Sequence, residues 1–215
     1  MSKKYLALAA LLVSVGATAT SNRIDIGNFS SNDLMGWEDQ SFAGHTQYSF
    51  ANGDSGTVLQ AVSDGSASGI GKRMKVDLNK TPYVNWSWKV EKGLPALNEK
   101  SKAGDDYAAR LYVVKSGGAL VWNTKAVNYV WSANAERDEN WPNAFRPKNA
   151  VMVAARGTGD ATGVWVHEKR NVKEDFKKLF GKNISSIDAI AIMTDTDNSG
   201  LSAQASYGDI YFTAE

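Results

Sequence analysis

Apolar and polar residues alternate along much of the chain, as they do in strands that bury one face. The clearest case is 83–90, where Trp86 and Trp88 alternate with Asn85 and Ser87. Similar patterns, some of them weaker, predict strands at 24–26, 46–50, 57–62, 71–76, 107–114, 126–131, 151–155, 164–167, 187–194 and 205–212. Strands separated by Gly, Asn and Asp turns predict an all-β fold, a two-sheet antiparallel, jelly-roll-like sandwich.

One segment has helical spacing instead. Asn171 is a suitable N-cap, and Glu174 follows three residues later, as in a capping box. Phe176 and Phe180 then fall on one face, and Gly181 is placed to end the helix. The sequence therefore predicts one short helix near 172–181 that packs on the sandwich through its aromatic side chains.

The N-terminus has the pattern of a secretory signal peptide. Lys3 and Lys4 precede an apolar stretch at 5–15, and small residues follow at 17–19. We expect cleavage after Ala19 and a periplasmic or secreted protein. No later segment reaches the roughly 20 apolar residues of a transmembrane helix, so the mature chain is predicted to have none.

Residues 20–215 are predicted to form a single β-sandwich domain, because neither long polar loop leaves a closed core on both sides. Cleavage would remove Lys3 and Lys4 from the 24 basic residues, leaving 22 against 23 acidic ones, a net charge of about −1. Near neutrality without basic runs argues against a nucleic-acid partner. With no cysteine in the chain, disulfides, thiolate catalysis and cysteine-ligated metals are excluded.

Charged residues within predicted strands are the first candidates for chemistry. Asp105 and Asp106 precede Arg110, and in a regular strand Asp106 and Arg110 would share a face. Two interpretations are open. The group either binds a polar ligand through the Arg110 guanidinium, or it is a buried ion pair that ties strands together.

Glu168 and Arg170 form a second charged pair, which would extend the Arg110 group if the two strands were neighbours. In an enzyme, Asp106 and Glu168 would be the catalytic acid and base of a glycosidase-type reaction. The alternative is that the two carboxylates have no catalytic role, since paired carboxylates are common in β-sandwiches.

A run of acids near the C-terminus has oxygen ligands at alternate positions. Asp195 and Asp197 precede Gly200, which resembles the opening of a calcium loop, but the bidentate acid that completes such a loop is absent. The same residue types build an ordinary tight turn, and a turn is favoured. A structural Ca²⁺ is the one cofactor that the sequence suggests.

Tryptophans are abundant, and an exposed indole stacks well on a sugar ring. Trp131 and Trp141 are the candidates for ligand contact, and Trp141 is expected to be exposed because its loop is polar. Packing in the core is the competing role for each.

Several motifs in order resemble a bacterial exported family, domain of unknown function 3047. They span nearly the whole mature chain: Trp86-Ser87-Trp88-Lys89-Val90, Asp105 to Val113, Asn128-Tyr129-Val130-Trp131, Glu168 to Val172 and Met193 to Gly200. The resemblance implies export in a Gram-negative bacterium and supplies no activity.

Both ends of the mature chain also resemble galactose-binding-like jelly rolls. Phe29, Trp37 and Phe42 carry this likeness near the N-terminus, and 207–212 carries it at the other end. In such modules an acid on the last strand often helps to hold a structural calcium. The resemblance assigns that role to Asp209, beside Asp195 and Asp197.

Three hypotheses follow. The first is an exported, non-catalytic module that binds a glycan or similar polar ligand, using 105–106, Arg110, the two tryptophans, Glu168 and Arg170. The second is a polysaccharide hydrolase or lyase. The third is a structural envelope protein in which the charges only neutralise each other.

Overall fold

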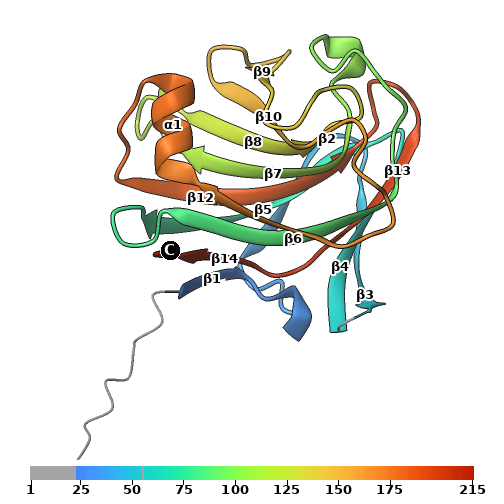
Figure 1. Ribbon diagram of the computed structural model, residues 1–215, viewed down its shortest axis with the longest axis horizontal. Helices are drawn as coiled ribbons and strands as arrows, with labels where there is room; N and C mark the ends of the chain where they lie inside the picture. Colours follow the sequence, from blue (N-terminus) through green and yellow to red (C-terminus); the bar gives the residue numbers. More distant parts are fainter. Residues whose placement is uncertain (1–22, 55) are drawn as a thin grey trace, which may run out of the picture.

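The computed structural model describes residues 23–54 and 56–215, so the predicted leader at 1–19 lies outside the described residues. Two seven-stranded sheets face each other (Figure 1). Sheet 1 comprises β1 (Arg23–Gly27), β14 (Ile210–Thr213), β6 (Tyr83–Lys92), β13 (Ser202–Tyr207), β4 (Gly56–Asp64) and β3 (Gln47–Gly53), in that order, with β11 (Val166–Asn171) also paired to β6. Sheet 2 comprises β2 (Trp37–Ala43), β5 (Ala67–Asp77), β12 (Ser186–Asp195), β7 (Tyr107–Lys115), β8 (Lys125–Trp131), β10 (Ala150–Arg156) and β9 (Asn140–Pro142).

The predicted all-β sandwich is confirmed. Every pairing is antiparallel except that of β8 with β10, which is parallel. Two strands were not predicted from the sequence pattern, because β2 has a mostly exposed, polar sequence and β9 has only three residues. The strand predicted at 205–212 is in fact two strands, β13 and β14. Short 3₁₀ turns occur at Phe29–Ser31 (η1), Lys102–Gly104 (η2) and Val121–Asn123 (η3).

An aromatic chain joins the two sheets through the core. Trp86 on β6 lies 5.3 Å from both Trp88 and Tyr129, measured between ring centroids. Trp88 in turn meets Trp131 of β8 edge-on at 6.0 Å. Each ring is at most 6% exposed, so the alternation in 83–90 correctly assigned Trp86 and Trp88 to the core face. Their burial orients the polar side chains of β6 outward.

A β-bulge interrupts β7. Arg110 pairs with Met193 and Tyr107 with Asp195, so two alanines, Ala108 and Ala109, oppose Thr194 alone. The extra residue reverses the alternation, and the Arg110 guanidinium lies 4.2 Å from the centroid of the Tyr107 ring. The condition of a regular strand, under which Asp106 and Arg110 would share a face, is therefore not met, because the bulge brings Tyr107 to the face that Arg110 occupies.

Helix α1 (Val172–Phe180) matches its prediction closely. The Asn171 side chain accepts a hydrogen bond from the Glu174 backbone N–H at 3.1 Å, and Gly181 ends the helix at φ +65°. Phe176 is fully buried, and the helix stands at one end of the sandwich (Figure 1). Within residues 23–54 and 56–215, no helix has the length and apolarity needed to span a membrane.

Replacing Phe176 by Ala should lower the free energy of unfolding by about 3–5 kcal/mol, because it removes a fully buried ring and leaves a cavity. Urea unfolding measures the change. Lys178→Ala on the exposed face of the same helix is the matched control and should change stability by less than about 0.5 kcal/mol. Equal effects of the two substitutions would show that α1 is not packed as described.

Candidate ligand-binding hollow

The predicted Arg110 group is sealed inside the protein. Arg110 is 3% exposed, and its Nε donates to Asp195 Oδ1 at 2.7 Å while Nη2 reaches the second oxygen of the same carboxylate. The guanidinium also donates to the Tyr112 hydroxyl and to the backbone carbonyl of Asp105, and the Asp105 carboxylate lies 3.9 Å from Nη1. Of the two interpretations, the geometry matches the buried ion pair. The closest acid is Asp195, which sequence reasoning had placed in a turn.

Asp106 has a different partner. Its carboxylate accepts hydrogen bonds from the backbone N–H groups of Asn198 at 3.1 Å and Ser199 at 2.7 Å, and it is 1% exposed. It therefore fixes the turn between β12 and β13. Asp106, Asp195 and Asp197 place carboxylate oxygens within 4.8 Å of one another, but both oxygens of Asp195 already bond Arg110.

Asp209 does not join the other acids of the predicted calcium set. It accepts from the backbone N–H and the hydroxyl of Ser30, at 2.8 and 2.6 Å. Among the described residues, the acids whose carboxylate oxygens lie together are Asp106, Asp195 and Asp197, whereas Asp209 lines the hollow described below.

Both members of the second predicted pair, Glu168 and Arg170, likewise have partners within the protein. Glu168 is 6% exposed and accepts from Arg156 Nε at 2.5 Å. Burial raises the pKa of Glu168, and Arg156 opposes the shift. Arg170 binds Asp138 and Asp175. Glu168 and Asp106, the acids of the hydrolase hypothesis, line different cavities, and each carboxylate is already bonded within the protein, to Arg156 and to the turn at 198–199 respectively.

The two candidate tryptophans are buried. Trp141 is 4% exposed, and the prediction that it is exposed is wrong. Its loop forms the short edge strand β9, and the indole packs in a second apolar cluster with Tyr107 and Met152. Trp131 is 6% exposed and packs against Trp88.

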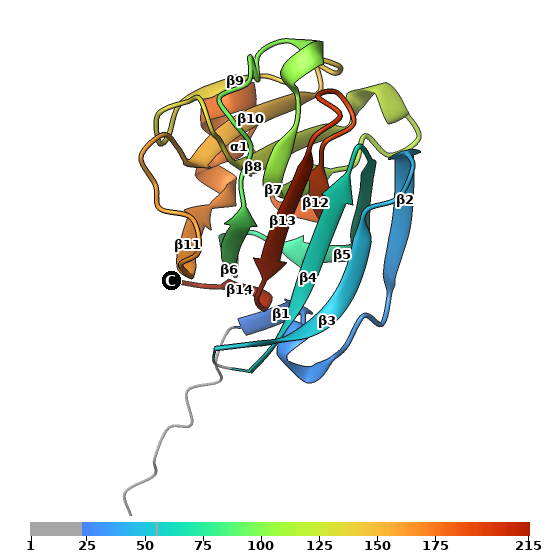
Figure 2. The ribbon, with the colours of Figure 1, turned by 90° about the vertical axis from the view of Figure 1, so that its right-hand side faces the viewer.

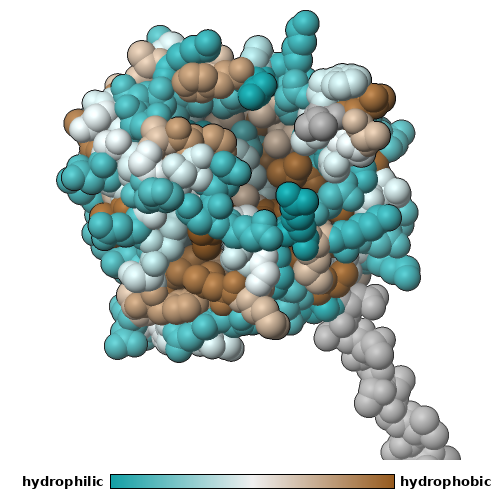
Figure 3. Space-filling model, turned by 180° about the vertical axis from the view of Figure 1, so that it is seen from behind, coloured by the Kyte–Doolittle hydropathy of each residue, from teal (hydrophilic) through white to brown (hydrophobic). Residues whose placement is uncertain are grey.

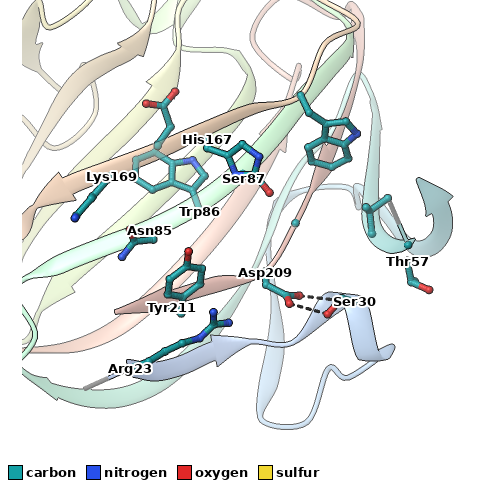
Figure 4. Close-up of a pocket in the computed structure, with 15 residues that line it drawn as sticks. Arg23, Ser30, Thr57, Asn85, Trp86, Ser87, His167, Lys169, Asp209 and Tyr211 are labelled. Carbon is teal, nitrogen blue, oxygen red and sulfur yellow. Dashed lines mark hydrogen bonds between the residues drawn. The ribbon is translucent and has the colours of Figure 1, made fainter. Parts of the chain in front are cut away.

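A solvent-reachable hollow of about 470 Å³ lies on the outer face of sheet 1 (Figure 4). It arises because β6 shares one edge between two partners: residues 88–92 pair with β13 and 83–85 pair with β14. Beyond them, β4 and β3 continue beside β13, whereas β1 follows β14 in another direction (Figure 2). The hollow opens where the two groups of strands diverge.

Polar side chains line the hollow in a register row. Lys169 of β11 is opposite Asn85 of β6, and Asn85 is opposite Tyr211 of β14. Neighbouring strands lie about 4.8 Å apart, so the row extends roughly 10 Å. The remaining lining residues are Arg23, Ser30, Gly56, Thr57, Val58, Trp86, Ser87, Trp165, His167, Glu168, Gly208 and Asp209.

Backbone packing fixes the floor of the hollow. The Gly208 N–H donates to the Ser87 carbonyl at 2.9 Å. A Cβ on Gly208 would lie 2.1 Å from Ser87 Oγ, so any larger residue there would force the Ser87 hydroxyl to move. The bonds from Ser30 to Asp209 attach η1 beside the floor (Figure 4).

Two aromatic rings border the hollow. Trp165 is half-buried at the start of β11, with the Lys89 ammonium 5.5 Å from its ring centroid. Tyr211 is half-buried beneath the Arg23 guanidinium, at 3.7 Å from the ring centroid. The hollow thus offers apolar ring surface together with hydroxyl, amide, imidazole and charged groups.

A second recess, of about 270 Å³, lies on the outer face of sheet 2. Its floor is formed largely by small residues, including Gly69, Gly71, Ala189 and Ala191. Figure 3, the view from behind, shows hydrophobic surface recessed between hydrophilic side chains. This recess has far fewer polar groups along its floor than the hollow of sheet 1.

The sequence-based site did not include most residues of the hollow. The polar face of 83–90, which contains Asn85 and Ser87, was a sequence signal of this site. The predicted site consisted instead of charged residues within strands and two tryptophans. Only Glu168 and Asp209 of the predicted residues line the hollow, and the Glu168 carboxylate is engaged by Arg156.

The chain belongs to the family described as "Protein of unknown function (DUF3047)", which matches residues 35–211. No curated protein matches it.

Solved structures similar to this chain are β-sandwiches. "Cellulose induced protein, Cip1" is 9% identical, with a TM-score of 0.51 over 85% of this chain and 93% of that one. The family 30 carbohydrate-binding module of a Clostridium thermocellum cellulosomal cellulase is 14% identical, with a TM-score of 0.46 over 84% and 92%. TmCBM61, solved with β-1,4-galactotriose, is 13% identical, with a TM-score of 0.43 over 87% and 94%. The likeness to Cip1 supports the fold alone.

Arg110→Ala should lower the free energy of unfolding by about 3–5 kcal/mol, because it leaves Asp195 buried without its cation. Chemical denaturation measures this loss, and Arg146→Ala, an exposed control, should have little effect. Replacing both partners, Arg110→Met with Asp195→Leu, should restore part of the stability. A single variant as stable as the wild type would contradict the buried ion pair.

Proposed function

We propose that the chain is an exported, non-catalytic binding module that holds a glycan in the hollow of sheet 1. The observation that carries the proposal is the composition of this 470 Å³ hollow. A half-buried indole, Trp165, lies beside an amide, hydroxyls, an imidazole and an ammonium group that come from β6, β11 and β14. Ligand sites combine apolar surface with a few polar groups in this way.

Sugars match such a surface chemically. The C–H face of a sugar ring is apolar and packs on an aromatic face, while its hydroxyls both donate and accept hydrogen bonds. In the hollow, the hydroxyls of Ser87 and Tyr211 can both donate and accept hydrogen bonds, and His167 is exposed beside them. A closed, wholly apolar sandwich would have favoured the structural envelope role, and the hollow favours a ligand.

The proposed export rests on the N-terminal sequence: Lys3 and Lys4, the apolar 5–15 and the small residues at 17–19. In a Gram-negative host, the mature protein should be recovered from the periplasm or the medium with Thr20 as its first residue. Intact mass measurement tests this, and a full-length protein retained in the cytoplasm would contradict it.

Trp165→Ala should weaken glycan binding by at least about tenfold, because a Trp that anchors a ligand contributes roughly 2 kcal/mol or more. A glycan array identifies ligands, and calorimetric titration then measures affinity. Trp122→Ala is the matched control, since Trp122 is 70% exposed on η3 and does not line the hollow. The unfolding midpoint of each variant is measured alongside. No binding in any titration, or equal losses in both variants, would contradict the proposed site.

A further inference from the structure

The charged side chains around the hollow differ in whether they are paired with another group of the protein. Asp209 accepts two hydrogen bonds from Ser30, and Asp25 accepts one from Arg23 Nε at 2.6 Å. Glu168 is engaged by Arg156, and Glu91, near Trp165, accepts from Ser206 and lies 3.5 Å from Lys89 Nζ. Each of these four acids therefore has a partner within the protein.

The two cations at the opposite ends of the register row, Lys169 and Arg23, have fewer acidic partners. Lys169 is exposed, and within the described part of the chain no carboxylate lies within 4.0 Å of its ammonium group. Its nearest described partner is the ring of Tyr83, at 4.9 Å from the centroid. Arg23 bonds Asp25 through Nε, and its guanidinium lies over Tyr211.

Lys169 forms the β11 end of the register row, and Arg23 lies over Tyr211 at the opposite, β14 end. Figure 4 shows Asn85 and Tyr211 between them, on the side of the hollow away from Thr57. The Asn85 amide is held by bonds from Nδ2 to the Tyr83 carbonyl and Thr213 Oγ1, at 3.1 and 3.0 Å. The two cations thus border a fixed polar floor on which no acid is free to pair with Lys169.

We infer that the ligand of the hollow is an acidic saccharide, whose anionic group binds at Lys169. This inference rests on the proposed function and specifies its ligand class. The anionic group is a carboxylate of a uronic acid or a sulfate ester, since both accept charge-assisted hydrogen bonds from ammonium and guanidinium groups. The sugar ring carrying it would pack toward Tyr211, and the following ring would reach Trp165.

Matched ligands separate charge from sugar shape. Oligomers of galacturonate, mannuronate and glucuronate are titrated beside their methyl-esterified, neutral counterparts, and sulfated galactan oligosaccharides form a second arm. We expect at least one acidic oligomer to bind about tenfold or more tightly than its neutral counterpart. That advantage should shrink as NaCl is raised, because salt screens exposed charges. The arm that binds identifies carboxylate or sulfate.

A variant that removes the charge of Lys169 tests the position of the anion. Lys169→Gln should weaken binding of the acidic oligomer about tenfold more than binding of its neutral counterpart, whereas Lys169→Arg should retain most of the affinity. Lys178→Gln makes the same charge change on α1, outside the hollow, and should have no effect.

The outcomes separate the two proposals. If neutral oligomers bind as tightly as acidic ones and Trp165→Ala weakens both, the proposed function stands and the acidic ligand is overturned. An acidic preference unchanged by Lys169→Gln also overturns the inference, because the anion then binds elsewhere. If no saccharide binds, both proposals fail.

Discussion

Strand β6 has to share one of its edges between two partners, and the outer face of sheet 1 takes its form from that division. Gly208 lies at the division: its N–H donates to the Ser87 carbonyl, and a Cβ there would displace the Ser87 hydroxyl. At this glycine β13 gives way to β14, and the strands beyond each of them diverge. A continuous strand over 202–213 would have given a regular sheet at the same place and removed the floor of the hollow.

The buried charged residues, in contrast to the polar residues of the hollow, stabilise the fold. Arg110 ties Asp195 to β7, Asp106 holds the turn after β12, and Glu168 takes Arg156. Each of these carboxylates or cations has lost its water and is stabilised by a specific partner. Their positions are thereby fixed, and none is free to bind a ligand. What remains free are the outward groups of β6, β11 and β14, whose inward neighbours form the aromatic core.

Much of the fold could be predicted from the sequence, and the site much less. Alternation around Trp86 and Trp88 predicts a half-buried strand, and Asn171 with Gly181 delimits the helix, because these features depend on local chemistry. The bulge at Ala108 and Ala109 has no local signal, since two alanines fit either side of a strand. Pairing Arg110 with Asp195 requires knowing that β7 and β12 are neighbours, which is a long-range fact of topology.

The same topology explains why the uncharged face of β6 matters more than its sequence suggests. Asn85 and Ser87 are unremarkable as single residues, but strand pairing sets Lys169 and Tyr211 beside Asn85, and His167 beside Ser87. Side chains on paired strands lose little further freedom when a ligand binds, so less of the binding free energy is spent on ordering them. Trp165 precedes β11 directly and shares part of that rigidity. A row of this kind favours an extended, multiply hydroxylated ligand that lies across strands over a compact one held by a single loop.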